Sequence, residues 1–124
     1  MNIYIANKKN MVGLVITDTN NMVSYYKAFP TKTDDKQAQA ILSIQRAISY
    51  VETNKVIDVP DEVNVYANYP INMEEVKSNE YIKRHRFNFT QKEAETDKEK
   101  QRMLLANVEI EMELRRNAIG IRGR

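Results

Sequence analysis

The stretch that decides the fold is NIYIANKKNMVGLVITDTNNMVSYYKAF, residues 2–29. Isoleucines alternate with polar or amphipathic neighbours over residues 2–6, the period of a half-buried strand. Residues 11–17 form a nearly continuous, β-branched hydrophobic run, which is typical of a central strand. Aspartate and asparagines at 18–21 favour a tight turn into a third strand over 22–29. Together these segments predict a three-stranded antiparallel meander.

A helix is expected after Pro30, which ends the third strand. Thr33 is the expected N-cap, with Asp34 and Asp35 in the first turn, where the helix dipole favours negative charge. Apolar residues then recur at helical spacing and form one stripe that would pack on the sheet. The stripe consists of Ile41, Ile44, Ile48 and Val51.

Further elements alternate towards the C-terminus. Residues 63–70, VNVYANYP, predict a fourth strand closed by proline. Residues 71–82 predict a weak helix or an irregular loop, and the alternation in 85–90 predicts a fifth strand. The expected fold class is therefore α+β, with a meander, a helix, further strands and a long C-terminal helix in a single domain over residues 1–124.

The C-terminal helix is predicted over residues 91–117. Thr90 and Glu93 have the spacing of a capping box. At about 100° per residue, the helix carries two apolar stripes on nearly opposite faces, although one stripe is enough to join its own core. The second stripe either packs inside the domain or contacts another subunit, and we favour a homo-oligomer because so small a domain has little else to cover it. The first stripe is Met103, Ala106, Ile110 and Leu114; the second, the expected oligomer interface, is Leu104, Leu105, Val108 and Met112.

Composition indicates an ordinary soluble globular protein. Hydrophobic residues make up 42% and charged residues 29% of the chain, the usual balance for such proteins. No apolar run approaches the roughly 20 residues that cross a bilayer, and the N-terminus lacks the pattern of a secretory signal. Without cysteine there is no disulfide or thiolate metal site. These features predict a cytoplasmic protein that does not contact membranes.

The predicted order β-β-β-α-β-(α)-β-α resembles that of the RNase H-like superfamily, and VNVYANYPIN (63–72) is similar to its fourth strand. The resemblance implies metal-binding carboxylates on the first strand, the first helix and the end of the fourth strand, which hold two Mg²⁺ ions. Here the matching positions are Asn7, Gln39 (or Gln37) and Asn68, all neutral amides. The alternative is that Asn7 and Asn68 are turn residues at strand ends. Either interpretation predicts no nuclease activity.

Other catalytic chemistry is also not indicated. His85 is the only histidine, so no second one can complete a His-based metal site or nucleophile pair; we expect it on the surface. The chain has no GxGxxG, Walker or CxxC motif. The carboxylates of residues 93–113 lie at helical spacing beside cations and predict a solvated face. We therefore expect a protein without enzymatic activity, cofactor or metal.

Residues 83–89, KRHRFNF, predict a ligand-binding segment. Arg84 and Arg86 match phosphate oxygens in a bidentate way. Phe87 and Phe89 offer faces on which bases stack, and the amide of Asn88 pairs with base or ribose edges. The alternative is that both phenylalanines pack into the core.

Arginines concentrate again at the C-terminus. Arg115 and Arg116 follow the last helical turns, where cations also favourably meet the helix dipole. Arg122 and Arg124 are interspersed with glycines, which allow the close backbone approach that phosphate binding often uses. This end of the chain is either a solvated helix terminus or a grip for a phosphate-bearing ligand.

The overall layout resembles the phage Thoeris anti-defence sponge family, whose oligomers sequester cyclic ADP-ribose signals, and in some cases cyclic oligonucleotides, without cleaving them. The resemblance implies a site in which Phe87 or Phe89 and Asn88 meet Arg115 and Arg116 of a partner. These arginines are adjacent rather than one turn apart, which leaves Arg122 or Arg124 to supply a second arm. The expected function is sequestration of a small phosphate-bearing nucleotide by a phage protein in the host cytoplasm; the alternative is a catalytically dead RNase H-like module that binds nucleic acid or a host protein.

Overall fold

The first thirty residues form the predicted antiparallel meander in the computed structural model, which describes residues 1–54 and 62–122, and side chains as far as Ala118. Strand β1 (Asn2–Lys8) pairs with β2 (Met11–Thr17), and β2 pairs with β3 (Val23–Pro30). Asp18 makes the turn before β3, because its carboxylate accepts hydrogen bonds from the backbone amides of Asn20 and Met22 at 2.8 and 2.9 Å.

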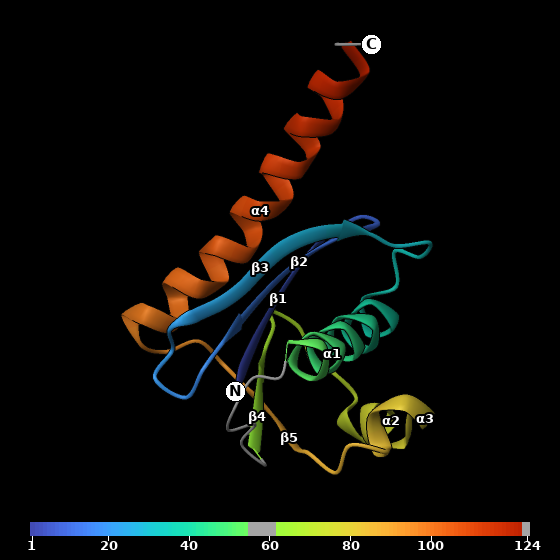
Figure 1. The fold of residues 1–124 in the computed structure, drawn as a ribbon, viewed down its shortest axis with the longest axis vertical. Coiled ribbons are helices and arrows are strands. Elements are labelled where there is room, and N and C mark those ends of the chain that lie inside the picture. The colour runs from blue at the N-terminus through green and yellow to red at the C-terminus, as the bar shows by residue number, and fades with distance from the viewer. Residues whose placement is uncertain (55–61, 123–124) are drawn as a thin grey trace.

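Two parallel strands extend the meander on the other side of β1. Strand β4 (Glu62–Tyr66) pairs with β1, and β5 (Asn88–Lys92) pairs with β4. The sheet order is β3-β2-β1-β4-β5 (Figure 1). The α+β class and the predicted order of elements are therefore confirmed.

Helices cover the two faces of the sheet unequally. Helix α1 (Lys36–Thr53) and the short helices α2 (Met73–Ser78) and α3 (Glu80–Lys83) lie on one face. Helix α4 (Asp97–Arg122) crosses the other face over β1, β2 and β3 and then projects beyond the sheet (Figure 1). Among the described helices, none is both long enough and apolar enough to cross a membrane.

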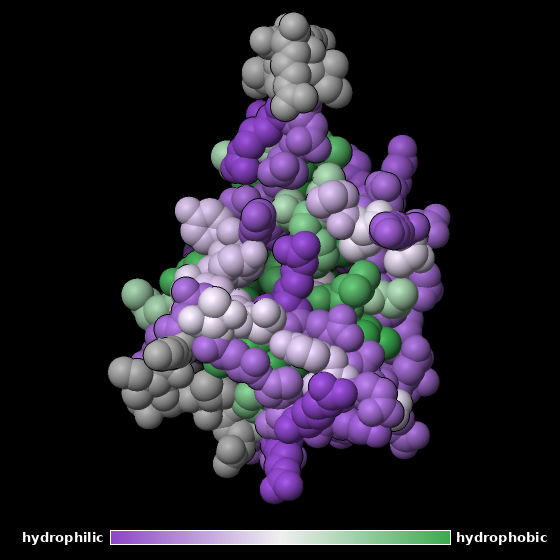
Figure 2. Space-filling view, turned by 45° about the vertical axis from the view of Figure 1, so that its right-hand side comes forward, coloured by the Kyte–Doolittle hydropathy of each residue, from purple (hydrophilic) through white to green (hydrophobic). Residues whose placement is uncertain are grey.

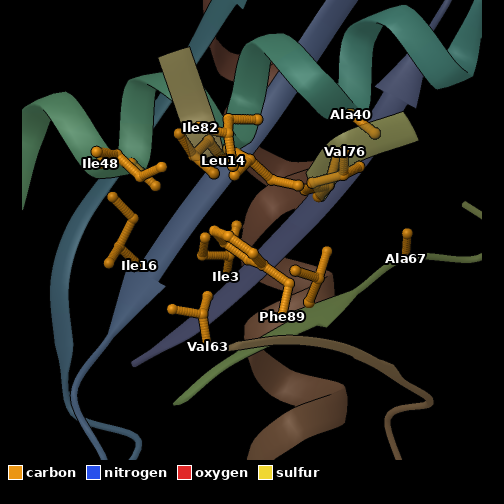
Figure 3. Packing of buried hydrophobic residues seen from close by; sticks show 14 of the residues in the cluster. Ile3, Leu14, Ile16, Ala40, Ile48, Val63, Ala67, Val76, Ile82 and Phe89 are labelled. Atoms are coloured by element: carbon orange, nitrogen blue, oxygen red, sulfur yellow. The ribbon is translucent and has the colours of Figure 1, made fainter. Parts of the chain in front are cut away.

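The larger core lies between the sheet and α1. Side chains of alternating parity on the strands, such as Ile3 and Leu14, meet the predicted apolar stripe of α1 (Figure 3). Within that stripe Ile44, Ile48 and Val51 are buried, and Ile41 is partly buried against the same core. Val76 of α2 and Ile82 of α3 complete this core, so the segment between β4 and β5 is anchored despite its short helices.

The second core lies beneath α4. Met103, Ala106 and Ile110 are buried against the sheet, as predicted, whereas Leu114 is 38% exposed because the helix has by then left the sheet. The approach is closest at Gly13, where an added Cβ would lie 1.9 Å from the carbonyl oxygen of Ala106. Only glycine leaves room for the helix backbone at this crossing.

Two predicted caps were wrong. Asp35, not Thr33, caps α1: its side chain accepts from the amide of Ala38 at 3.0 Å, so Asp34 and Asp35 precede the first turn. Helix α4 begins at Asp97 rather than residue 91, since Thr90, Gln91 and Lys92 belong to β5.

Two predicted strands were misplaced at their ends. Strand β4 stops at Tyr66, short of the proline that the pattern suggested as its end, because residues 67–70 turn away from the sheet. Strand β5 begins at Asn88 rather than at His85. The residue before Phe87, Arg86, has a positive φ of 53°, which is incompatible with an extended strand at that point.

Candidate functional site

The carboxyl end of β1 meets the first turn of α1 at a pair of amide side chains. The Nδ2 of Asn7 donates to the Oε1 of Gln39 at 2.6 Å. Asn7 is half-buried at the end of β1, and Gln39 is fully buried. The structure thus joins the two positions at which the RNase H-like resemblance expects metal-binding acids, and both are neutral.

Gln39 is held in a way that requires an amide. Its Nε2 donates to the carbonyl oxygen of Lys9 at 2.8 Å, to the Oγ1 of Thr31 at 3.0 Å and to the carbonyl oxygen of Thr33 at 3.0 Å. A carboxylate has no hydrogen to donate and would face two carbonyl oxygens with a negative charge. The site therefore favours glutamine over the glutamate of a metal centre.

Two further glutamines extend this arrangement, which we call the amide centre (Asn7, Gln37, Gln39 and Gln91). Gln37 exchanges hydrogen bonds with the backbone of Asn72 at 2.9 and 3.1 Å. Gln91 donates to the carbonyl oxygen of Tyr69 at 2.6 Å and accepts from the amide of Ile71 at 2.8 Å. The amide centre ties α1 and β5 to the chain that follows β4.

The groups around the amide centre do not supply the set of carboxylates that a two-metal centre needs, as far as the described residues go. The hydroxyl of Tyr69 donates to the carbonyl oxygen of Lys36 at 3.2 Å, and burial raises its pKa to about 12, so the phenol stays neutral at physiological pH. Asn68, the third predicted position, is exposed. Among the described residues, no group of three or more histidines, cysteines or carboxylates is placed to bind a metal. These residues do not fit a two-magnesium centre.

The predicted segment at 83–89 divides between surface and core. Arg84, at the end of α3, and Arg86 are exposed, as is Asn88. Phe89 is only 4% exposed and belongs to the core beneath α1, and Phe87 is half-buried against that core. Phe89 therefore has almost no surface to offer a ligand, which agrees with the alternative interpretation for this residue.

His85 has a structural role that its sequence neighbours do not reveal. Its Nδ1 lies 3.0 Å from the carbonyl oxygen of Tyr81, and its Nε2 contacts the carboxylate of Glu52 at the end of α1. The ring lies near the rings of Tyr81 and Phe87, at centroid distances of 5.1 and 6.3 Å. Rather than standing free on the surface, the ring links α3 to α1, a contact between residues more than thirty positions apart.

The C-terminal arginines lie far from the segment at 83–89. Arg115 and Arg116 are exposed on the projecting part of α4, where Arg116 pairs with Glu113 at 3.0 Å. Figure 1 places this part of α4 and α3 at opposite ends of the molecule's longest axis. The side chain of Arg122 and all of Arg124 lie outside the described part of the chain. The two predicted groups of cations are therefore not brought together within one chain.

The outer stripe of α4 is open to solvent. Leu104, Val108 and Met112 are 62%, 40% and 44% exposed, and Leu105 is half-buried against the core beneath the helix. Figure 2 shows apolar side chains, in green, along the projecting part of the helix. An ion pair between Lys8 and Glu111, at 2.8 Å, borders this stripe.

Comparisons with protein-family models, curated proteins and solved structures find no match to this chain.

Proposed function

We propose that this chain is a non-catalytic, self-associating protein of RNase H-like architecture that binds and sequesters a small phosphate-bearing nucleotide. The element order supports the architecture, and the Asn7–Gln39 pair carries the proposal that the protein acts by binding. In the proposed setting it is a phage protein that withholds a signal, such as cyclic ADP-ribose or a cyclic oligonucleotide, from a host defence system.

The proposal that the amide centre does not catalyse phosphodiester cleavage rests on its hydrogen bonds as well as on its residue types. Phosphodiester cleavage by two metal ions needs anionic oxygens that hold both ions. The NH₂ group of Gln39 donates to backbone carbonyl oxygens and to Thr31, and its oxygen accepts a hydrogen bond from Asn7. A fold that uses these positions for its own hydrogen bonds retains the architecture of a nuclease but has a binding role instead.

Self-association is proposed through the outer stripe of α4. The helix has 26 residues, about 39 Å at 1.5 Å per residue, and only its first half lies over the sheet. A projecting segment of this length is marginal as an isolated helix in water. A second copy packed on the outer stripe would cover Leu104 and Val108 above the sheet and Met112 where the helix begins to project. It would also carry Arg115 and Arg116 towards a neighbouring subunit.

The second candidate is a catalytically dead module that binds nucleic acid or a host protein. The observation that favours it is the exposure of Arg84 and Arg86, neither of which forms an ion pair among the described residues. Salt separates the two candidates. Binding to a polymer releases many counterions and weakens steeply between 50 and 200 mM salt, whereas a ligand with two or three phosphates gives a shallow dependence.

Mass spectrometry of small molecules released by heating the purified protein tests the proposal directly. We expect an intact nucleotide at up to one per subunit. Recovery of a cleaved product, or Mg²⁺-dependent degradation of added DNA or RNA, would overturn the non-catalytic assignment. Protein purified after unfolding and refolding provides the ligand-free control, and adding back the recovered nucleotide should raise its melting temperature.

A further inference from the structure

A cavity of about 610 Å³ lies between α1, the segment that leaves β3 and α3. Its volume is in the range of small-molecule sites, about 300–1,000 Å³. This side of the molecule, which comes forward in Figure 2, mixes apolar and charged side chains. The cavity adjoins the amide centre, because Thr31 and Thr33 line it and also bind Gln39, but its lining includes neither the four amides nor the arginines that the sequence suggested.

Arg46 is the most informative residue of this cavity. Its guanidinium lies 3.9 Å from the centre of the Phe29 ring, a cation–π contact that holds the side chain in place. Among the described residues, Arg46 forms no ion pair with a carboxylate. A stacked guanidinium keeps its N–H groups at its edge, where a phosphate can accept two of them.

The rest of the lining has the chemistry of a nucleotide site. Lys32 adds a second positive charge, and neither aspartate nor glutamate is among the residues that line the cavity. Ser49 and Thr33 bring hydroxyl groups. Leu42, which is 39% exposed, and the ring of Tyr81 provide apolar surface against which a base can pack.

A second cavity illustrates why this one is preferred. About 680 Å³ is open at the carboxyl ends of β4 and β5, where sheets of this kind often bind ligands. There Lys92 is adjacent to Glu93, so the charges of the lining balance. A phosphate would gain little attraction from such a lining, whereas the cavity at Arg46 carries two cations and no carboxylate.

We infer that the cavity at Arg46 is the binding site for the phosphate-bearing nucleotide, an inference that rests on the proposed function. The phosphates bind the guanidinium of Arg46 and the ammonium of Lys32, and the base packs against Leu42 and Tyr81. The arginines at 84–86 and 115–116 then lie outside the site. Specificity for nucleotides over simple anions comes from the apolar surface of Leu42 and Tyr81, which line the same cavity as the two cations.

Titration of the isotope-labelled, full-length protein with ADP, followed by amide chemical shifts, tests this assignment. We expect shifts centred on residues 31–33, 42–49 and 81. Inorganic pyrophosphate should reproduce the shifts near Lys32 and Arg46, and adenosine those near Leu42 and Tyr81. Arg46→Ala should weaken ADP binding about 10-fold or more, the usual loss for a charged hydrogen bond, and Lys32→Ala should weaken it several-fold.

Arg84→Ala is the matched control, because it removes the same charge from an exposed site. It should leave ADP affinity within about 2-fold of the wild type. Since Arg46→Ala also uncovers the ring of Phe29, Arg46→Lys provides a second variant that keeps the charge but loses the planar fork; we expect an intermediate affinity.

Shifts centred on 84–88 or 115–116, an equal loss of affinity in Arg84→Ala, or no shifts with ADP would overturn the assignment. The heat-release experiment separates this failure from that of the proposed function. A nucleotide recovered equally from the wild type and from Arg46→Ala means that the ligand binds elsewhere. No nucleotide from the wild type and no ADP binding would overturn both proposals.

Discussion

Gln39 and Leu104 are placed opposite to what their side chains usually prefer. The amide of Gln39 is fully buried, whereas Leu104 is 62% exposed. A buried polar group or a continuous stripe of exposed apolar side chains is informative in a folded protein, whereas single exposed apolar side chains are common. The first indicates a group that the fold uses itself, and the second a surface that the fold alone does not use.

The two regions differ in how completely their side chains find partners within the same chain. Every hydrogen-bonding atom of the Gln39 side chain has a partner in its own chain, so this region is closed to a ligand. In the outer stripe of α4, by contrast, only Leu105 packs partly against the core, and Leu104, Val108 and Met112 are exposed. Variants in the first region should therefore change folding stability, and variants in the second should change association.

The largest effect is expected for Gln39→Glu. A glutamate at this position replaces a donor with a buried negative charge that faces the carbonyl oxygens of Lys9 and Thr33. Breaking a buried polar arrangement in this way costs about 3–5 kcal/mol. Urea denaturation at pH 7 should show a loss of this size in the free energy of unfolding.

Gln37→Glu is the matched control for this variant, because Gln37 is only half-buried and bonds the exposed backbone of Asn72. We expect it to cost about 1 kcal/mol. If Gln39→Glu is instead as stable as the wild type and gains stability with millimolar Mg²⁺, the site retains the capacity for a metal, and its interpretation as a closed amide centre is wrong.

A smaller but sharper contrast is expected between the two faces of α4. Ile110→Ala removes a side chain that is 1% exposed in the core beneath the helix, which typically costs about 2–4 kcal/mol. Leu104→Ala removes an exposed side chain and should change the free energy of unfolding of an isolated subunit by about 0.5 kcal/mol or less. Urea denaturation at low protein concentration measures both.

Sedimentation velocity over a range of protein concentrations gives the converse test for α4. The wild type should form dimers or larger assemblies, and Leu104→Glu, which places a charge in the outer stripe, should shift the equilibrium towards the single subunit. A wild type that sediments as a single subunit at high micromolar concentration would show that the stripe does not bind a second copy.

Local patterns predicted the fold well because they report on local physics. The alternation in 2–6 and the continuous apolar run in 11–17 reflect which face of each strand is buried, and that was sufficient for the meander. The two stripes of α4 were likewise visible at helical spacing. The bond between Asn7 and Gln39, by contrast, joins residues 32 positions apart. Their residue types suggested lost acids, but only the fold shows that they contact each other.

No comparable pattern in the sequence predicted the cavity at Arg46. Arg46 is one cation within an amphipathic helix, and its contact with Phe29 depends on how α1 packs against the end of β3. The predicted segment 83–89 attracted attention because its cations and aromatic rings are adjacent in sequence. Adjacency did not place them in one site, since Phe89 faces the core and Arg84 faces solvent.

The start of α4 shows how a correct rule selects the wrong residues. The sequence contains two candidate capping boxes, Thr90 with Glu93 and Thr96 with Glu99. In the structure the second is used: the Oγ1 of Thr96 accepts from the amide of Glu99 at 3.2 Å, and the carboxylate of Glu99 accepts from the amide of Thr96 at 3.0 Å. Thr90 is paired within β5. Strand pairing, a tertiary constraint, therefore decided between two equally good local signals.

A modest loss of stability, about 1 kcal/mol, is expected for Glu99→Gln, and it should depend on pH. Hydrogen bonds from the backbone amides of Thr96 and Glu95 hold the pKa of Glu99 below its usual 4.5, and the hydroxyl of Tyr66 adds a third bond. Because the folded-state pKa is the lower one, the carboxylate stabilises the fold above pH 4.5, and this contribution is lost as the pH falls through the folded-state value. The difference in unfolding free energy between wild type and Glu99→Gln should thus be full at pH 7 and vanish once the pH is below the folded-state pKa of Glu99. Glu93→Gln, in the unused capping box, is the control and should match the wild type; an equal effect of both substitutions would show that general charge, rather than the cap, sets the stability of α4.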